Sequence, residues 1–114
     1  METKISKNEN DVYLIELSGI MELSGSIELK EIILKTIGQK IEGIIISFKE
    51  VVSVNSSGIG ALIFVSSTLK KLNCPLIIIM PDGPVLRALE VTRLTGYFNI
   101  VPTLKDALSC ASSK

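Results

Sequence analysis

The fold of this chain is decided by residues 51–62, which read VVSVNSSGIGAL. The apolar, β-branched run at residues 44–48 precedes this stretch and predicts a buried strand, and the pattern after it is helical as far as Leu72. The polar residues therefore fall where a strand gives way to a helix, with Lys49 and Glu50 beginning the connecting loop. In open α/β sheets this junction lies at the carboxyl ends of the strands, where ligands and chemistry are usually found.

The residues at this junction suit the amino end of a helix. Asn55 or Ser56 can cap the helix through a side-chain oxygen, while Gly58 and Gly60 leave the first turn bare enough for another backbone or a phosphate to approach. The free amides and the positive end of the helix dipole favour an anion at this position. A simple capping role for these residues is the alternative to a functional one.

Length and charge limit the classes of protein to consider. The 114 residues are expected to form a single domain, 1–114, with residues 109–114 as a frayed tail. The hydrophobic fraction of 46% is spread over short runs, none of them long enough for a membrane span, and the first residues contain no apolar signal segment. We therefore expect a cytoplasmic protein that does not insert into a membrane.

The charged residues do not indicate a nucleic-acid partner. Twelve basic and twelve acidic residues balance, and no basic cluster is denser than Lys70-Lys71. Protein partners are expected instead.

Neither a metal site nor a known catalytic device is predicted. The chain contains no histidine, and Cys74 and Cys110 lack metal-ligand spacing, so they are interpreted as reduced structural thiols. Without histidine the chain cannot form a Ser-His-Asp catalytic triad, and its sequence contains neither a P-loop nor a dinucleotide-binding motif. We expect no cofactor and no enzymatic activity.

The order of predicted elements indicates an α/β fold. Strands are predicted at residues 3–7, 12–17, 44–48, 76–80 and 98–101. One helix is predicted to follow a cap at Ser24 or Ser26, and another to follow a cap at Thr103. Two more are predicted from residue 57 to 72 and from residue 84 to about 95. This alternation favours a largely parallel sheet whose first strand is antiparallel, at or near an edge. Phe64 either completes the core or lies exposed beside residues 55–60 as a protein contact, and the core position is favoured.

Three segments resemble a known family. Residues 55–60, Asn-Ser-Ser-Gly-Ile-Gly, resemble the Asp-Ser-Ser-Gly-Leu-Gly signature of the anti-sigma factor antagonists, which belong to the STAS domain family. Residues 19–22 followed by 26–29 resemble the turn of that family into its first helix, and residues 85–100 resemble its late helix-to-strand segment. The resemblance implies a STAS-like α/β fold, with a mixed, mostly parallel sheet of about five strands and about four helices.

The resemblance also implies a function and a site. Ser56 would be phosphorylated by an anti-sigma factor that is itself an ATP-using serine kinase, with Ser57 as the alternative acceptor. The unphosphorylated protein would capture this kinase and release its sigma factor, the phosphorylated protein would dissociate, and a serine phosphatase would reset it. The implied partner-binding residues are Glu22, Ser24, Asn55, Ser57, Gly58, Ile59 and Gly60.

Two residues depart from the family pattern. Asn55 stands where the family usually has aspartate; it keeps the capping ability but lacks the charge. If that charge helps to orient the hydroxyl or to repel a departing phosphorylated partner, exchange is expected to be slow or absent. Glu22, also at an aspartate position, keeps the charge on a longer arm. The alternative function is a non-catalytic STAS subunit of a signalling scaffold or of a lipid-transport ATPase complex, in which the serine need not be phosphorylated.

Overall fold

The computed structural model describes residues 1–112. The elements occur in the order β1 (Glu2–Lys7), β2 (Val12–Met21), α1 (Leu23–Thr36), β3 (Gly43–Val54), α2 (Ser56–Lys71), β4 (Leu76–Ile79), α3 (Pro84–Val91), the 3₁₀ turn η1 (Thr95–Tyr97), β5 (Ile100–Val101) and α4 (Leu104–Ser112). The predicted order of strands and helices is confirmed, with η1 as an added short turn. None of the helices in the described part has the length and apolarity needed to cross a bilayer.

The five strands form one mixed sheet in the order β1-β2-β3-β4-β5. β1 pairs with β2 in the antiparallel direction, and every later neighbouring pair is parallel. The prediction of an antiparallel first strand at the edge of a mostly parallel sheet is therefore confirmed. Parallel pairing places the carboxyl ends of β2, β3 and β4 at the same end of the sheet.

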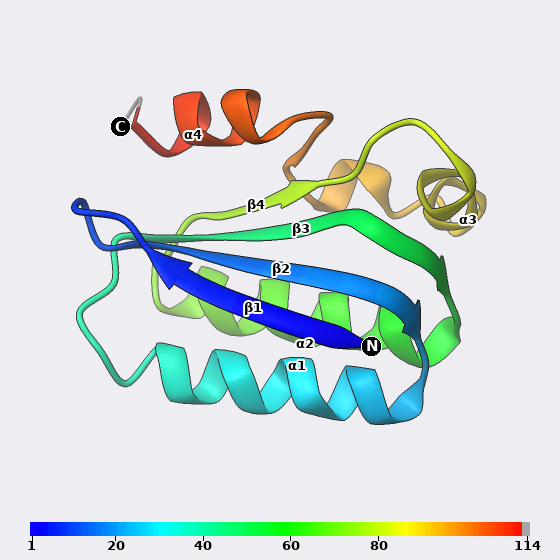
Figure 1. Cartoon of the computed structure of the whole chain (residues 1–114), viewed down its shortest axis with the longest axis horizontal. Coiled ribbons are helices and arrows are strands. Elements are labelled where there is room, and N and C mark those ends of the chain that lie inside the picture. Colours follow the sequence, from blue (N-terminus) through cyan, green and yellow to red (C-terminus); the bar gives the residue numbers. More distant parts are fainter. Residues whose placement is uncertain (113–114) are drawn as a thin grey trace.

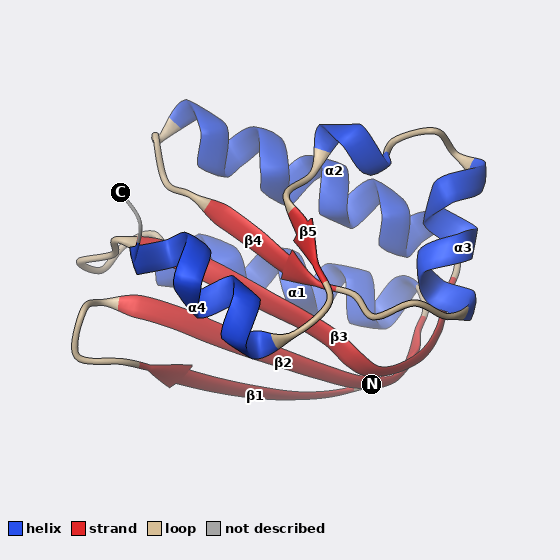
Figure 2. Ribbon diagram, turned by 90° about the horizontal axis from the view of Figure 1, so that it is seen from above, coloured by secondary structure: helices blue, strands red, loops and turns tan. Residues whose placement is uncertain are grey.

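Helices cover the two faces of the sheet unequally. α1 and α2 lie side by side on one face, α4 lies on the other, and α3 sits beyond one end of the strands (Figures 1 and 2). The larger core cluster fills the space under α1 and α2 and includes Ile33, Ile46 and Leu69. A smaller cluster under α4 includes Ile45 and Ala107. Because both faces of central β3 are covered here, its first half is a continuous apolar run.

β3 is longer than the sequence predicted. It continues through Lys49 and Glu50 to Val54, so the expected loop at Lys49 is wrong. β2 extends beside it to the same end, with register shifts between Glu16 and Ser18 and between Gly19 and Ile20. The second half of β3 mixes polar and apolar residues and is mostly exposed, with Lys49, Glu50, Val52 and Ser53 at the surface, and this pattern was interpreted as a loop.

Three helix boundaries also differ from the predictions. Glu22 caps α1 without a side-chain hydrogen bond, so neither Ser24 nor Ser26 is the cap. α3 ends at Val91, and η1 follows it, because the chain turns through Arg93 at a φ of 62° before Gly96 is reached. α4 runs to Ser112, so residues 109–112 of the expected frayed tail are helical, whereas residues 113–114 lie outside the described part. Thr103 does cap α4, because its hydroxyl accepts a hydrogen bond from the amide of Asp106 at 3.1 Å.

The first turn of α2 packs directly against the ends of β2 and β3. A Cβ atom placed on Gly58 would lie 2.5 Å from Cγ1 of Val54 and 3.2 Å from Sδ of Met21. Val54 has little rotational freedom at χ1 because its side chain is β-branched. A Cβ atom on Gly60, two residues further on, would meet nothing within 4 Å. Gly58 is therefore required by close packing, and Gly60 is not.

We predict opposite effects when each of these glycines is changed to alanine. Gly58→Ala should lower the free energy of unfolding by about 1–3 kcal/mol, because the added methyl group overpacks the junction. Gly60→Ala is the matched control and should raise it by about 0.5–1 kcal/mol, because alanine loses less backbone entropy in a helix. Urea denaturation of both variants measures the two changes. Equal effects would contradict the proposed packing constraint.

Candidate functional site

The serine motif, residues 55–60, lies where β3 ends and α2 begins, as predicted. Asn55 is the N-cap of α2, and its Oδ1 accepts hydrogen bonds from the amides of Ser57 at 3.1 Å and Gly58 at 3.2 Å. Of the two predicted caps, Asn55 or Ser56, the structure uses Asn55. Capping by Asn55 satisfies amides that have no partner within the helix and leaves the side chain of Ser56 uncommitted.

Ser57 is held by a hydrogen-bonded chain that joins the two helices. Its hydroxyl donates to Oδ1 of Asn55 at 2.5 Å and lies 3.2 Å from Oγ of Ser26 on α1. Oγ of Ser26 also lies 3.0 Å from the backbone oxygen of Glu22, so its single proton is shared between that oxygen and Oγ of Ser57. Ser57 is half-buried, and its contact with Ser26 fixes the amino end of α2 against the amino end of α1.

Ser56 differs from Ser57 in both exposure and bonding. It is the first residue of α2 and is exposed, and its hydroxyl has no hydrogen-bond partner within residues 1–112. The first turn of α2 contains no acidic residue. The positive end of the helix dipole is therefore not neutralised by the helix itself, and a negatively charged group attached at Ser56 would be stabilised there.

The other predicted contact residues separate into exposed and packed ones. Glu22, Ser24, Asn55 and Gly60 are exposed around Ser56, at the amino ends of α1 and α2. Gly58 is buried, and Ile59 is half-buried and packs against the main core, so the backbone and packing of the junction occupy both. The structure therefore places four of the predicted contact residues on one accessible surface.

The exposed apolar side chains near this surface were not among the predicted contact residues. Leu23, the first residue of α1, is 63% exposed, and Ile27 is 49% exposed one turn later. Ile20 at the end of β2 and Val52 near the end of β3 are also exposed. The four-residue spacing of Leu23 and Ile27, offset from the buried pair Leu29 and Ile33, was the available signal in the sequence.

Phe64 is on the surface, so the favoured core position is wrong. Its side chain is 39% exposed, and the ammonium group of Lys30 lies 5.2 Å from its ring centroid. Phe64 follows Ser56 and Gly60 at intervals of four residues, which places all three on one face of α2. That face is turned away from the sheet because Ala61, Leu62 and Val65 supply the buried face.

Comparison with known proteins identifies the family. The model of the STAS domain matches residues 4–107, which is most of the chain. The chain belongs to the STAS domain family. No curated protein sequence matches it significantly. The fold expected from the three resembling segments, a mixed, mostly parallel sheet of about five strands with about four helices, is confirmed.

Solved structures with this fold include regulators and a transport-related protein. The chain is similar to an anti-sigma factor antagonist from Mycobacterium paratuberculosis, with 22% identity and a TM-score of 0.80, covering 96% of this chain and 92% of the other. It is similar to the Bacillus cell fate determinant SpoIIAA in its phosphorylated form, with 19% identity and a TM-score of 0.73, covering 95% and 97%. A sulfate transporter family protein from Wolinella succinogenes is 18% identical, with a TM-score of 0.79 and coverage of 89% and 84%.

We predict that stability depends on the capping oxygen of Asn55. Asn55→Ala should lower the free energy of unfolding by about 1 kcal/mol, because two amides of α2 lose their acceptor. Asn55→Asp is the control: it keeps the acceptor and adds a charge that the helix dipole favours by roughly 0.3–1 kcal/mol, so it should be at least as stable as the wild type. Thermal or urea unfolding measures both. An alanine variant as stable as the wild type would mean that the cap contributes nothing.

Proposed function

We propose that this STAS domain is an anti-sigma factor antagonist that is switched off by phosphorylation of Ser56. Unphosphorylated, it binds an anti-sigma factor that is an ATP-using serine kinase, and the bound sigma factor is released to direct transcription. Phosphorylated, it dissociates, and a serine phosphatase restores it. The chain itself is non-catalytic in this scheme and acts in the cytoplasm of a bacterium.

One observation carries the choice of Ser56: of the two adjacent hydroxyls, only that of Ser56 is exposed and free of hydrogen bonds within the described residues. A kinase must reach the acceptor oxygen, whereas Ser57 is half-buried and its hydroxyl is bonded to Asn55. Phosphorylation of Ser57 would break its contacts with Asn55 and Ser26, and these contacts fix α2 against α1.

The surface around Ser56 supports a switch that acts through docking. Exposed Leu23 and Ile27 adjoin the exposed polar residues Glu22 and Ser24, and this mixture suits a protein interface with an apolar centre and a polar rim. Phosphorylation adds about −1.5 to −2 charges and three acceptor oxygens to that surface. The free protein tolerates the phosphate because it lies at a helix amino end, whereas a packed complex must desolvate it.

A second candidate function is favoured by Asn55. Where the family usually has aspartate, this chain has a neutral residue, and the sulfate transporter family protein has the same fold. The chain would then be a non-catalytic STAS subunit of a signalling scaffold or a lipid-transport ATPase complex, with Ser56 unmodified. Affinity capture from native lysate separates the two candidates: recovery of a serine-kinase anti-sigma factor supports the first, and recovery of transporter subunits supports the second.

We predict that phosphorylation depends on Ser56 and not on Ser57. When the chain is incubated with ATP, Mg²⁺ and the serine-kinase anti-sigma factor captured with it, intact-mass spectrometry should show one added phosphate on the wild type and on Ser57→Ala, and none on Ser56→Ala. The Ser57→Ala variant is the matched control, since it removes the adjacent hydroxyl. Phosphate retained by Ser56→Ala would refute the assignment of Ser56.

A further inference from the structure

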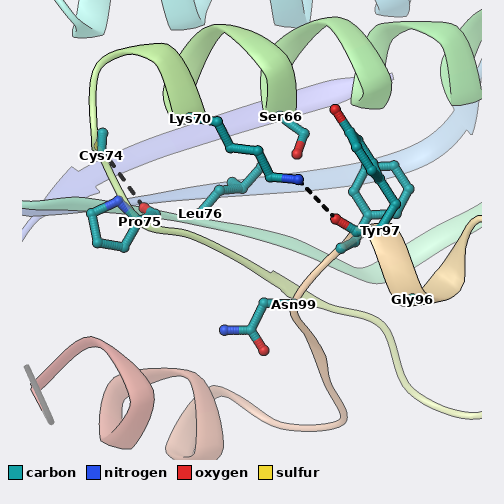
Figure 3. A pocket seen from close by; sticks show the side chains of 9 residues that line it. Ser66, Lys70, Cys74, Pro75, Leu76, Gly96, Tyr97 and Asn99 are labelled. Atoms are coloured by element: carbon teal, nitrogen blue, oxygen red, sulfur yellow. Dashed lines mark hydrogen bonds between the residues drawn. The ribbon is translucent and has the colours of Figure 1, made fainter.

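A cavity of about 450 Å³, whose lining side chains are shown in Figure 3, is bounded by Ser66 and Lys70 near the carboxyl end of α2, away from Ser56 at its amino end. Its walls come from the last turns of α2, the start of β4 and the segment that leads from η1 into β5. The size falls in the range of pockets that hold small organic molecules. The cavity shares no residue with the surface around Ser56, so an inference about it does not depend on the proposed function.

The cavity contains one charged side chain, and that charge is held in place. The ammonium group of Lys70 lies 3.7 Å from the ring centroid of Tyr97 and donates to the backbone oxygen of Tyr97 at 3.4 Å (Figure 3). Within residues 1–112 no acidic group forms an ion pair with it. No acidic residue lines the cavity either. An anion in the cavity would therefore lie near the ammonium group of Lys70, which still has N–H groups available to donate a hydrogen bond.

A second donor comes from the backbone of β4. The amides of Ile78 and Met80 point to the β5 edge, where they donate to Asn99 and Val101 at 2.8 and 2.9 Å. The amide of Leu76, two residues before Ile78, points to the same edge, because alternate residues of a strand share a direction. β5 begins at Ile100 and is too short to reach it, so within the described residues this amide has no acceptor. Leu76 lines the cavity.

The remaining walls combine apolar side chains with the polar residues Ser66 and Asn99. Pro75, Phe98 and the side chain of Leu76 provide a hydrophobic surface beside the two donors. The ring of Tyr97 closes one side, and its hydroxyl lies 3.0 Å from Oγ of Ser67. This hydrogen bond lowers the pKa of Tyr97, and the nearby charge of Lys70 acts in the same direction. The hydrogen bond to Ser67 and the contact with the ammonium group of Lys70 position the ring of Tyr97 as one wall of the cavity.

We infer that this cavity binds a small organic anion, with a carboxylate or phosphate group between Lys70 and the amide of Leu76 and an apolar body against Pro75 and Phe98. The ammonium group of Lys70 favours a negatively charged ligand, and the amide of Leu76 orients its charged group. The apolar walls favour an organic ligand over an inorganic ion. The ligand would bind without competing for the surface around Ser56, which lies at the other end of α2.

The probes are naphthoate, naphthyl phosphate and the uncharged naphthalenemethanol, titrated into the full ¹⁵N-labelled chain and followed by NMR. We expect saturable shifts of the Leu76 amide with the anions, and at least about tenfold weaker binding of the uncharged analogue. Comparing the two anions shows whether carboxylate or phosphate fits better. Equal affinity of the uncharged analogue, or a Leu76 amide that does not move at saturation, would overturn the inference.

Lys70→Gln and Lys71→Gln are matched variants, since they remove neighbouring charges from the same end of α2. Lys70→Gln should weaken binding of the preferred anion at least about tenfold, because a charge-assisted contact is lost. Lys71→Gln should leave it unchanged, because Lys71 does not line the cavity. The amide spectra of both variants verify that they are folded. Equal losses in the two variants would show that general surface charge attracts the probe, and would refute the site.

Discussion

The close approach between the first turn of α2 and the ends of β2 and β3 fixes the geometry of the serine motif. Gly58 has no side chain, so the helix can lie against Val54 and Met21, whose atoms occupy the space that a Cβ would need. With the helix this close to the strands, Oδ1 of Asn55 caps it by accepting from the amide of Gly58, and the hydroxyl of Ser57 contacts that of Ser26. Ser56 is then left on the outer side of the same turn.

Two adjacent serines consequently have different physical roles. The hydroxyl of Ser57 links Asn55 to Ser26 and stabilises the contact between α1 and α2, while the hydroxyl of Ser56 faces solvent at the positive end of a helix. In the proposed switch, added charge at Ser56 changes what the surface can dock without breaking a contact that holds the fold. Phosphorylation would act on the complex far more than on the monomer.

Much of this fold could be predicted because buried strands must be apolar. Residues 44–48 and 76–80 were recognisable on that basis, and Asn55 was recognisable as a cap. The second half of β3 was missed, because it is mostly exposed and carries polar residues such as Lys49. Phe64 was misplaced, because the helical pattern alone does not fix which residue at the edge of the apolar stripe turns outward. The bonding of Ser57 depends on Ser26, a tertiary contact that no local pattern encodes.

A switch that changes the docking surface without changing the fold can be tested by comparing amide NMR spectra of the chain with Ser56 unmodified and with Ser56 fully phosphorylated. We expect large shifts only at the amino ends of α1 and α2, around Glu22 and residues 55–60, with the core signals of Ile46 and Leu69 unchanged. Shifts spread through the sheet would contradict this expectation, because the switch would then depend on a rearranged fold and not on a changed docking surface.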